Sequence, residues 1–398
     1  MTSVPGEQRP HPIQQLLREW PPGYGGVERV AHELAMVWGG AVWSLDAQGS
    51  SLREQDAIPA RYLRRRLART PALGRLVLPL PSAGLWSLLR SRQPLHGHLP
   101  SIGVLLVLLL ARLLRPQRRV TAHWHFFFEP ASGFKGRFFG IYQWLALRVV
   151  SWLSGVLTTS PSLKAELVRC GCRSERVAVL PCCLSHDQEA AALVATRSSP
   201  QTQANPELRV LFIGRLGSYK RLDWLLQGLA SVESSWSLDV VGDGPRRADF
   251  EALSDQLTAS RPNGEVRFHG RLSEADKLSQ LLAADLLVLP SESSNEAFGI
   301  VQLEAMAAGL PALAFQRWRS GMGWVCQLAD LDWSQTPEDL PLVLQKLADD
   351  PVLLRHLGVQ ARVRYEQLFC RNIWLNQLQS WSNPMTCSQT PVGFRARG

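Results

Sequence analysis

Short apolar segments alternate with helical segments along most of the chain, and this alternation restricts the possible folds more than any other feature of the sequence. In the first half, we predict strands at Ile13–Leu17, Ala41–Leu45, Leu76–Leu80, Val120–His125, Val156–Thr159 and Val177–Leu180, with helices over 27–38, 102–114 and 135–153 and from Ser162 onward. Strands separated by helices pair in parallel, because the connection has to cross one face of the sheet. The first half therefore predicts an α/β domain with a parallel sheet.

The same alternation starts again after residue 207. The predicted strands are 208–214, 237–242, 265–270, 285–290 and 311–315, with helices from Lys220, Arg246 and Glu274, and the chain is mostly helical from 335 to about 381. Between the halves, residues 183–207 lose the alternation and are rich in Ser, Pro, Gln and Asn, which is typical of a connection between domains. We therefore predict an α/β fold with two tandem Rossmann-like domains facing across a cleft, since open α/β sheets bind ligands at the carboxyl ends of their strands.

The predicted boundaries are an N-terminal domain over 1–182 and a C-terminal domain over 183–365, followed by 366–398, a helix that packs back on the N-terminal domain and a loose tail. A length of 398 residues, with 45% hydrophobic and 19% charged residues, suits two globular domains and argues against a disordered chain. The charge is uneven: residues 1–180 hold 23 basic and 10 acidic side chains, and residues 181–398 hold 20 and 24. The basic character therefore belongs to the N-terminal half.

No secretory signal is recognisable at the N-terminus, and the longest apolar run, 102–110, is too short to cross a bilayer at about 20 residues per helix. We expect a cytoplasmic protein that can also lie on the inner face of the cell membrane. Four of the seven cysteines lie close together, at Cys170, Cys172, Cys182 and Cys183. Their spacing differs from that of structural zinc sites, so we interpret them as reduced thiols and predict no metal.

The segment Ser291–Pro311 carries the most chemical information. It follows a predicted strand and then becomes helical, with Glu296 ahead of the helix and Glu304 within it. Glu304 lies on the same stripe as the apolar Ile300, where a carboxylate needs a partner. Glu296 precedes the helix at the point where free backbone N–H groups favour an anion. The alternative is that both glutamates are ordinary solvated residues of a helix and its first turn.

Three further segments follow predicted strands. A glycine-rich turn holds Gly25 and Gly26, whose amides can approach a phosphate or a sugar closely, although a plain turn is an equal alternative. Arg215 and Lys220 place two cations where a diphosphate could bind, or they are solvated loop residues. His123 and His125 lie at the carboxyl end of a predicted strand, where a ligand could bind, although packing in the core is the commoner role for each of them.

Two other segments have features of ligand sites. VGDGPRR (241–247) is interpreted mainly as a tight turn at the edge of the cleft. The Asp-x-Asp of Asp330 and Asp332 is similar to the metal-binding sequence of another class of sugar transferases, but it follows no strong strand and is discounted.

Taken together, YGGVE, HWH, GRL-x3-K, VGDGP and NEAFGIVQLEAMAAG, in this order, resemble glycosyltransferase family 4, whose members are retaining enzymes of the GT-B fold. The resemblance extends from Ile13 to about Trp381. It departs from the family at CCLSHDQE (182–189) and at SGMGWVCQLADLDW (320–333), where the usual turns are missing.

The resemblance implies a role for each matching residue. Arg215 and Lys220 would bind the diphosphate, Glu296 the hydroxyls of the transferred sugar, and Glu304 the ribose hydroxyls. Gly25 and Gly26 would contact the donor phosphate or sugar. The phosphate would also be bound by the backbone of Phe298, Gly299 and Ile300. The donor sugar would be contacted near the reacting centre by His125. Arg, Lys and helix-end amides would stabilise the leaving diphosphate, so no cofactor or metal is required.

The implied function is transfer of a hexose from a nucleotide diphosphate sugar to a glycan or lipid-linked acceptor in cell-surface polysaccharide or glycolipid synthesis. A UDP-sugar is favoured by the resemblance and a GDP-sugar is possible, and the hexose is open among galactose, glucose and mannose types. The alternatives are a nucleotide-sugar-binding protein without turnover and, with little support, a nucleic-acid-binding protein. We expect no nucleic acid partner, because the Arg-rich stretches of the basic half contain no recognition motif and two Rossmann-like domains offer no obvious element that reads a groove.

Two stretches that mix Arg with Leu, 61–70 and 109–119, suit the surface of an anionic bilayer. They favour a membrane-bound acceptor. The alternative is that they are solvated helices packed on the sheet.

Overall fold

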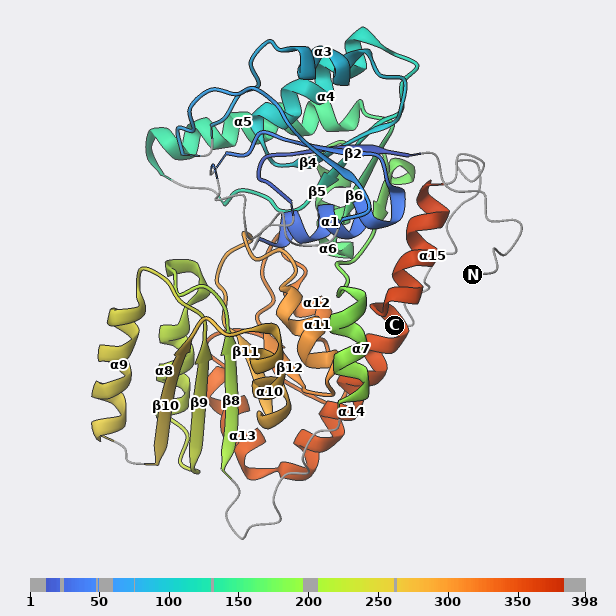
Figure 1. The fold of residues 1–398 in the computed structure, drawn as a ribbon. Coiled ribbons are helices and arrows are strands. Elements are labelled where there is room, and N and C mark those ends of the chain that lie inside the picture. Colours follow the sequence, from blue (N-terminus) through green and yellow to red (C-terminus); the bar gives the residue numbers. More distant parts are fainter. Residues whose placement is uncertain are drawn as a thin grey trace. The chain divides into compact units, whose positions relative to one another are not determined.

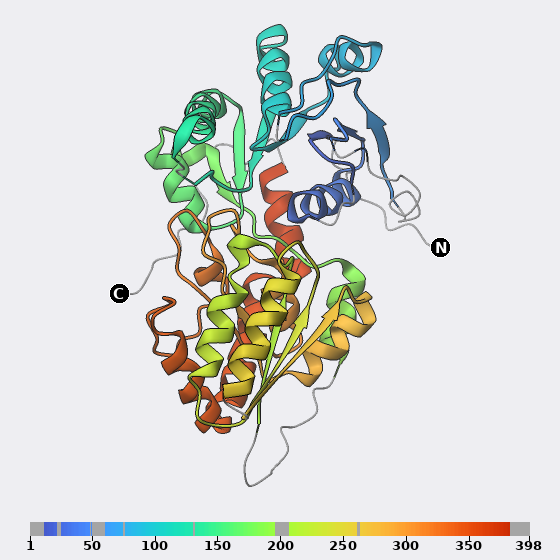
Figure 2. The same ribbon diagram turned by 90° about the vertical axis from the view of Figure 1, so that its left-hand side faces the viewer.

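The computed structural model describes residues 12–21, 25–47, 49, 60–74, 76–129, 132–195, 207–260 and 263–382. The chain forms two compact units (Figures 1 and 2). Unit 1 consists of Met1–Pro181 and Leu375–Gly398, and unit 2 of Cys182–Trp374.

Unit 1 is built on a parallel seven-stranded sheet in the order β3-β2-β1-β4-β5-β6-β7. Its strands are β1 (Gln14–Leu17), β2 (Ala41–Ser44), β3 (Leu63–Arg66), β4 (Leu95–Leu99), β5 (Val120–Trp124), β6 (Gly155–Thr158) and β7 (Val177–Val179). Its helices are α1 (Gly26–Trp38), α3 (Ala83–Arg90), α4 (Ile102–Leu114), α5 (Gly133–Ser151), α6 (Pro161–Arg169) and the short η1 (Ser174–Arg176). In Figure 1, α3, α4 and α5 lie together on one face of this sheet and α1 lies on the other.

Unit 2 contains a parallel five-stranded sheet in the order β10-β9-β8-β11-β12. The strands are β8 (Leu208–Ile213), β9 (Trp236–Val241), β10 (Gly264–Gly270), β11 (Leu286–Leu289) and β12 (Ala312–Ala314). The helices are α7 (His186–Val194), η2 (Ser218–Lys220), α8 (Leu222–Ala230), α9 (Arg247–Ser260), α10 (Glu274–Ala283), α11 (Ile300–Ala307), α12 (Met322–Val325), α13 (Leu340–Asp349) and α14 (Pro351–Leu368). Helix α8 packs against α9 and α13, and α11 packs against α7 and α14. The predicted fold class, two Rossmann-like α/β domains in tandem, is confirmed.

The last described helix, α15 (Arg371–Ser382), contributes its residues from Leu375 onward to unit 1. Arg119 donates hydrogen bonds to the carbonyl oxygens of Trp381 and Ser382, at 2.9 and 3.1 Å. The ring of Trp381 stacks on that of Trp38 in α1. These contacts attach the helix to the α1 face of the sheet.

The prediction of a strand at Leu76–Leu80 was wrong. Residues 76 and 79 form only isolated bridges, and the two strands that the prediction omitted are β3 and β4. Strand β3 lies at the sheet edge, where exposed Arg residues suit a strand that must not pair with another chain. Strand β4 has the sequence LHGHL and is fully buried. Because it contains two histidines and a glycine, hydrophobic periodicity does not identify it as a strand.

Two further expectations are corrected by the structure. The basic stretch 61–70 contains β3 rather than a helix. The supposed connection 183–207 begins with α7, which Ser185 starts with a capping box: its hydroxyl accepts from the Gln188 amide, and the Gln188 side chain accepts from the Ser185 amide. Among the described residues, no helix combines the length and apolar character needed to cross a membrane.

Candidate functional site

The order of the strands in unit 2 defines one ligand-binding edge. From β8 the chain moves to β9 and β10 on one side of the sheet, and then returns to β11 and β12 on the other side. The loops that follow β8 and β11 therefore diverge at the carboxyl ends of two neighbouring strands, which is where open α/β sheets bind ligands. These two loops contain Arg215, Lys220 and Glu296.

Lys220 and Glu296 form a direct ion pair between these loops, although they are 76 residues apart in sequence. The side chain of Lys220 is 9% exposed and that of Glu296 is 17% exposed. Burial is the largest single influence and would lower the pKa of Lys220. The charge of Glu296, the neighbouring Tyr219 and the hydrogen bond to Glu296 together outweigh it, so the net pKa is raised. Lys220 is therefore held in its charged form at the switch point.

A second set of contacts holds the two loops in register. The Glu292 amide donates to the Tyr219 carbonyl at 3.0 Å. Arg221, which has a left-handed backbone (φ 48°), donates to Glu292 and to Asp223, each at 2.7 Å, and its guanidinium lies over the Trp224 ring. Because several groups fix Arg221, the neighbouring Lys220 is positioned by the fold and not only by its own ion pair.

Arg215 lies in the loop after β8, two residues beyond the last residue of the strand, and is exposed. Within the described ranges, its guanidinium forms no ion pair. The backbone beside it packs closely on the VGDG turn: a Cβ on Gly242 (φ 139°) would lie 1.9 Å from the Gly214 carbonyl oxygen, and one on Gly244 would lie 2.3 Å from that of Leu216. The turn thus requires glycines for this close approach, and it supports the loop that presents Arg215.

The start of α11 offers backbone donors next to Glu296. Gly299 is the N-cap and has φ 73°, and a Cβ there would lie 2.5 Å from Leu289 Cδ2. In the part of the chain that the structure describes, the amides of Gly299 and Ile300 donate to no backbone carbonyl. The Gln302 side chain donates to the Phe298 carbonyl oxygen at 2.8 Å and so holds the turn. Free amides at a helix N-terminus are suited to an anion.

Glu304 is buried within α11, on the side that packs into the domain, as the sequence indicated. Its Oε2 lies 2.9 Å from Nζ of Lys277 in α10, and this lysine also contacts Glu274 at 2.9 Å. Lys277 from the adjacent helix is therefore the charged partner that the buried Glu304 carboxylate needs.

Unit 1 contains the remaining predicted residues. Gly25 is the N-cap of α1, and Gly26 is its first residue. His125 follows β5 directly; its amide donates to the Leu99 carbonyl at 2.9 Å, and its ring stacks on His123 with centroids 4.2 Å apart. Both histidines are buried. His123 packs in the core, and His125 lies just beneath the carboxyl edge of the sheet.

One group of described residues has the composition of a metal site: His96, His98 and His123 each offer a ring nitrogen, and the three atoms lie within 4.8 Å of one another. Both nitrogens of His98, however, already have hydrogen-bond partners, in His125 and Gln15. Only two imidazoles keep a free lone pair, fewer than a structural or catalytic zinc site uses. The discounted Asp330 instead bonds to His356 and Gln360.

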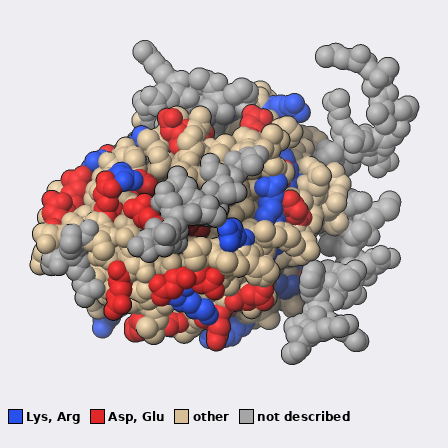
Figure 3. All heavy atoms as spheres, turned by 90° about the horizontal axis from the view of Figure 1, so that it is seen from below, with Lys and Arg blue, Asp and Glu red and all other residues tan. Residues whose placement is uncertain are grey.

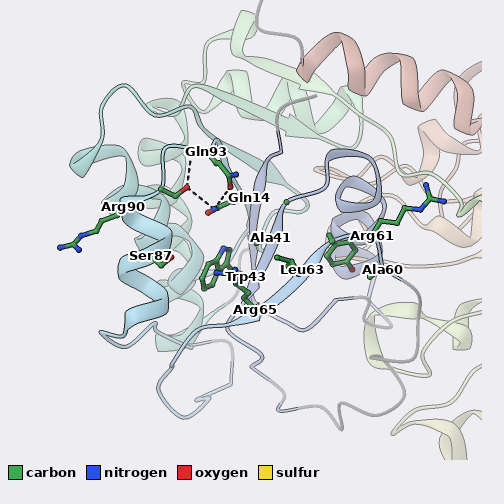
Figure 4. Close-up of a pocket in the computed structure, with 13 residues that line it drawn as sticks. Gln14, Ala41, Trp43, Ala60, Arg61, Leu63, Arg65, Ser87, Arg90 and Gln93 are labelled. Carbon is green, nitrogen blue, oxygen red and sulfur yellow. Dashed lines mark hydrogen bonds between the residues drawn. The ribbon is translucent and has the colours of Figure 1, made fainter. Parts of the chain in front are cut away.

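A pocket of about 910 Å³ lies elsewhere in unit 1 (Figure 4). Its walls include the first residues of β1, β2 and β3, which are Gln14, Ala41 and Leu63. These mark the amino ends of the strands, whereas the predicted residues of unit 1 follow carboxyl ends. The pocket is therefore separate from the candidate site.

Sequence reasoning missed the residues that hold the site together. Arg221 and Glu292 were not singled out, nor was Ser320, whose hydroxyl donates to the Glu296 carbonyl at 2.6 Å. Arg221 directly follows Lys220, which was itself a predicted site residue, so the sequence could have identified Arg221 as well. Ser320 had no local signal, because its contact spans 24 residues.

Two family models match the chain. Residues 24–188 match the model described as Glycosyltransferase Family 4, and residues 196–323 match Glycosyl transferases group 1. Sulfoquinovosyl transferase SQD2 of Arabidopsis thaliana is 39% identical over 106 residues, 26% of this chain and 19% of that protein. D-rhamnosyltransferase WbpZ of Pseudomonas aeruginosa is 29% identical over 163 residues, 40% of this chain and 41% of that protein. The chain thus spans less than half the length of these relatives.

Solved structures are similar over nearly the whole chain. Anabaena Alr3699/HepE in complex with UDP has a TM-score of 0.67 at 17% identity and covers 94% of this chain and 99% of that one. Sucrose-phosphate synthase from Thermosynechococcus elongatus has a TM-score of 0.64 at 20% identity, with 93% and 98% covered. At this identity the likeness is one of fold, and it identifies the architecture as GT-B.

Proposed function

The chain belongs to the glycosyltransferases of family 4, and on that premise we propose that it transfers a hexose, with retention of configuration, from a nucleotide diphosphate sugar to a glycan or lipid-linked acceptor in polysaccharide or glycolipid synthesis. One observation carries the proposal. Lys220 and Glu296 meet at the switch point of unit 2, beside the exposed Arg215 and the free amides that begin α11.

The leaving diphosphate is bound in this proposal by Arg215, Lys220 and the backbone of Phe298, Gly299 and Ile300. Each is a donor that is already in place before the ligand arrives, so little reorganisation accompanies the build-up of negative charge on the leaving group. Lys220 has three donor protons and uses one toward Glu296, which leaves others for phosphate oxygens.

Glu296 and Glu304 take different roles. Glu296 accepts from hydroxyls of the transferred sugar, and its pairing with Lys220 places the sugar next to the diphosphate. Glu304 accepts from the ribose hydroxyls, with the contact to Lys277 keeping its carboxylate oriented. In unit 1, Gly25 and Gly26 contribute backbone contacts with the donor phosphate or sugar, and His125 contributes a contact with the sugar.

The donor is a UDP-sugar or a GDP-sugar. Support for UDP comes from HepE, whose fold this chain shares and whose structures contain UDP and UDP-glucose. A screen of UDP, GDP and their hexose conjugates by thermal shift distinguishes them, because a ligand that binds only the native state raises the midpoint according to its affinity.

Transfer requires the paired residues, so we expect Lys220→Ala and Glu296→Ala each to abolish hexose transfer and donor hydrolysis. Lys346→Ala is the matched control, because Lys346 is an exposed cation in the last turn of α13. Full activity in either site variant would remove the assignment. Donor binding without transfer or hydrolysis by the wild-type protein would indicate a binding protein instead.

The acceptor in this proposal is presented at an anionic membrane surface. Helix α5 exposes a stripe of large apolar side chains with helical spacing, formed by Phe134, Phe138, Ile141 and Leu145. The exposed Arg137 and Arg148 lie on the same helix. Such a helix can place its apolar face in the interface while Arg meets anionic head groups.

Helix α4 packs against α5 and adds to this surface. Its last turn exposes Leu113 and Leu114 next to Arg112, so one of the two stretches that the sequence singled out contributes. By contrast, acidic and basic side chains are interspersed among the described residues of the face drawn in Figure 3. The α4–α5 surface, with its exposed Arg side chains, is therefore better suited to an anionic bilayer than that face.

Sedimentation with vesicles tests this surface. We expect the protein to sediment with vesicles that contain phosphatidylglycerol at low salt, and the double variant Phe134→Ser/Ile141→Ser to stay in solution. Leu342→Ser/Val352→Ser is the control, because it removes two equally exposed apolar side chains from unit 2. Equal sedimentation of both variants would exclude the α5 surface.

A further inference from the structure

A buried polar layer lies on the α1 face of the sheet in unit 1. Strands β1, β4 and β5 contribute Gln15, His96, His98, Thr121 and His123 to this layer, and His125, which directly follows β5, completes it. Gly97 points the other way, because a Cβ there would meet Leu108 of α4. Burying polar side chains is costly unless hydrogen bonds satisfy them, so the bonds within this layer determine the protonation of the rings that form them.

The backbone of α1 fixes the orientation of the Gln15 amide. With its oxygen toward α1, the amide accepts from the Ala35 N–H at 3.0 Å, while its nitrogen donates to the Ala31 carbonyl at 3.3 Å and to His98 Nε2 at 2.8 Å. The reverse orientation would place the amide oxygen against the Ala31 carbonyl oxygen and the NH2 group against the Ala35 N–H. Since backbone groups cannot exchange donor and acceptor roles, Gln15 must donate to His98.

This orientation determines the proton positions on two histidines in turn. His98 Nε2 accepts from Gln15, so the single proton of a neutral His98 ring is on Nδ1. That nitrogen lies 2.9 Å from His125 Nε2 and donates to it. His125 Nε2 is then an acceptor, and the proton of a neutral His125 is on Nδ1.

Both rings are neutral in this arrangement. Burial, with smaller contributions from the neighbouring imidazoles, holds the pKa of His98 and of His125 well below the usual value of 6.5. A charged ring in either position would also turn one accepting nitrogen into a donor, which would then face another N–H group.

We propose that Gln15 and His98 are positioning residues that hold His125 as the neutral Nδ1–H tautomer, so that His125 donates a hydrogen bond to the donor sugar and does not act as a base. The part of this inference that concerns the sugar rests on the proposed function. His125 Nδ1 has no hydrogen-bond partner among the described residues, so its proton is available to a ligand oxygen.

Histidine tautomers are read directly by NMR of protein labelled with 15N only in histidine. The chain has nine histidines, and the resonances that disappear in His125→Ala identify His125. In the wild-type protein without ligand, we expect a pyrrole-type Nδ1 and a pyridine-type Nε2 for both His98 and His125. A pyridine-type Nδ1 on His125 would overturn the inference, whatever the activity.

Variants along the chain of hydrogen bonds should move the tautomer of His125. Gln15→Leu and His98→Leu remove donors and should give His125 with the proton on Nε2, or a mixture. His98→Asn can still donate to His125 Nε2 and should restore the wild-type signature. Thr121→Val is the control: Thr121 bonds to His96 Nδ1 at 2.9 Å in the same layer but not to His98 or His125.

We expect the transfer activity to depend on the tautomer of His125. Gln15→Leu should lower kcat for transfer about tenfold, which corresponds to the loss of one hydrogen bond in the transition state, and His98→Asn should recover most of it. If Gln15→Leu changes the tautomer but not kcat, the link between tautomer and transfer is wrong. Full activity in His125→Ala would instead remove the proposed role of His125 and leave the tautomer result intact.

The same spectra test the competing metal site. With Co²⁺ or Zn²⁺ added to the full-length protein, we expect no stoichiometric change in the His98 resonances, because both of its nitrogens are engaged. Stoichiometric binding that shifts His96, His98 and His123 together, and that is lost in His123→Ala, would show that a metal occupies the layer and would overturn the hydrogen-bond chain.

Discussion

Replacing Lys220 by Met tests how strongly the site residues depend on each other. Methionine has nearly the length and volume of lysine, so the packing over Gly214, whose Cβ position lies 3.4 Å from the Lys220 side chain, changes little. The charge is lost, and the Glu296 carboxylate is left without its partner in a largely buried position.

The expected loss of folding free energy in Lys220→Met follows from the burial of the Lys220–Glu296 pair. Removing one partner of a buried ion pair costs about 3–5 kcal/mol, because the other charge remains desolvated. Glu296 keeps 17% of its side chain exposed, which places the expected loss near the lower end, at about 3 kcal/mol. For a unit of this size, such a loss lowers the unfolding midpoint of unit 2 by about 6–12 °C.

A double-mutant cycle separates the pair from the packing. Lys220→Met/Glu296→Gln removes both charges while keeping both shapes, and such replacements are often nearly neutral. We therefore expect the double variant to be more stable than Lys220→Met alone, with a coupling of about 2 kcal/mol. Lys346→Met, at an exposed position, should change stability by less than about 0.5 kcal/mol.

The assay is urea unfolding followed by circular dichroism, with hydrogen exchange of peptides from unit 2 to locate the change. Additive losses in the double variant, or a Lys220→Met protein as stable as the wild type, would show that the two charges are not coupled.

Further predictions concern pH and ligand binding. Because the folded-state pKa of Lys220 is raised, its contribution to stability should be complete below pH about 10.5 and be lost as the pH rises through the folded-state pKa; Lys220→Met should not show this loss in a urea series at alkaline pH. Gly299→Ala should weaken UDP binding at least about tenfold, because its Cβ would lie 2.5 Å from Leu289 and its φ disfavours a side chain; unchanged affinity in calorimetry would contradict this. Glu304→Gln should weaken UDP binding but not pyrophosphate binding, whereas Arg215→Ala should weaken both; equal effects of Glu304→Gln on the two ligands would exclude a ribose contact.

The local architecture of the site was accessible from sequence. Strand β11, the loop after it and helix α11 were all predicted, because a short apolar run and a helical stripe are periodic signals that depend on neighbouring residues. The burial of Glu304 followed from the same periodicity. The position of Lys220 after β8 was equally local.

Long-range partners were not accessible in this way. The pairing of Lys220 with Glu296 joins loops 76 residues apart, and Lys277 reaches Glu304 from another helix. The bond between Gln15 and His98 spans 83 residues. Such contacts depend on strand order, and strand order in unit 1 was itself obscured because β3 is basic and β4 is rich in histidine.

We propose that the switch point of unit 2 binds a nucleotide diphosphate, and calorimetric titration of UDP and GDP is the direct test. We expect saturable 1:1 binding of at least one of them, weakened at least about tenfold in Arg215→Ala and in Lys220→Ala and unchanged in Lys346→Ala. If neither nucleotide binds, or if binding is unaffected by the loss of Arg215 and Lys220, the proposed donor site is wrong.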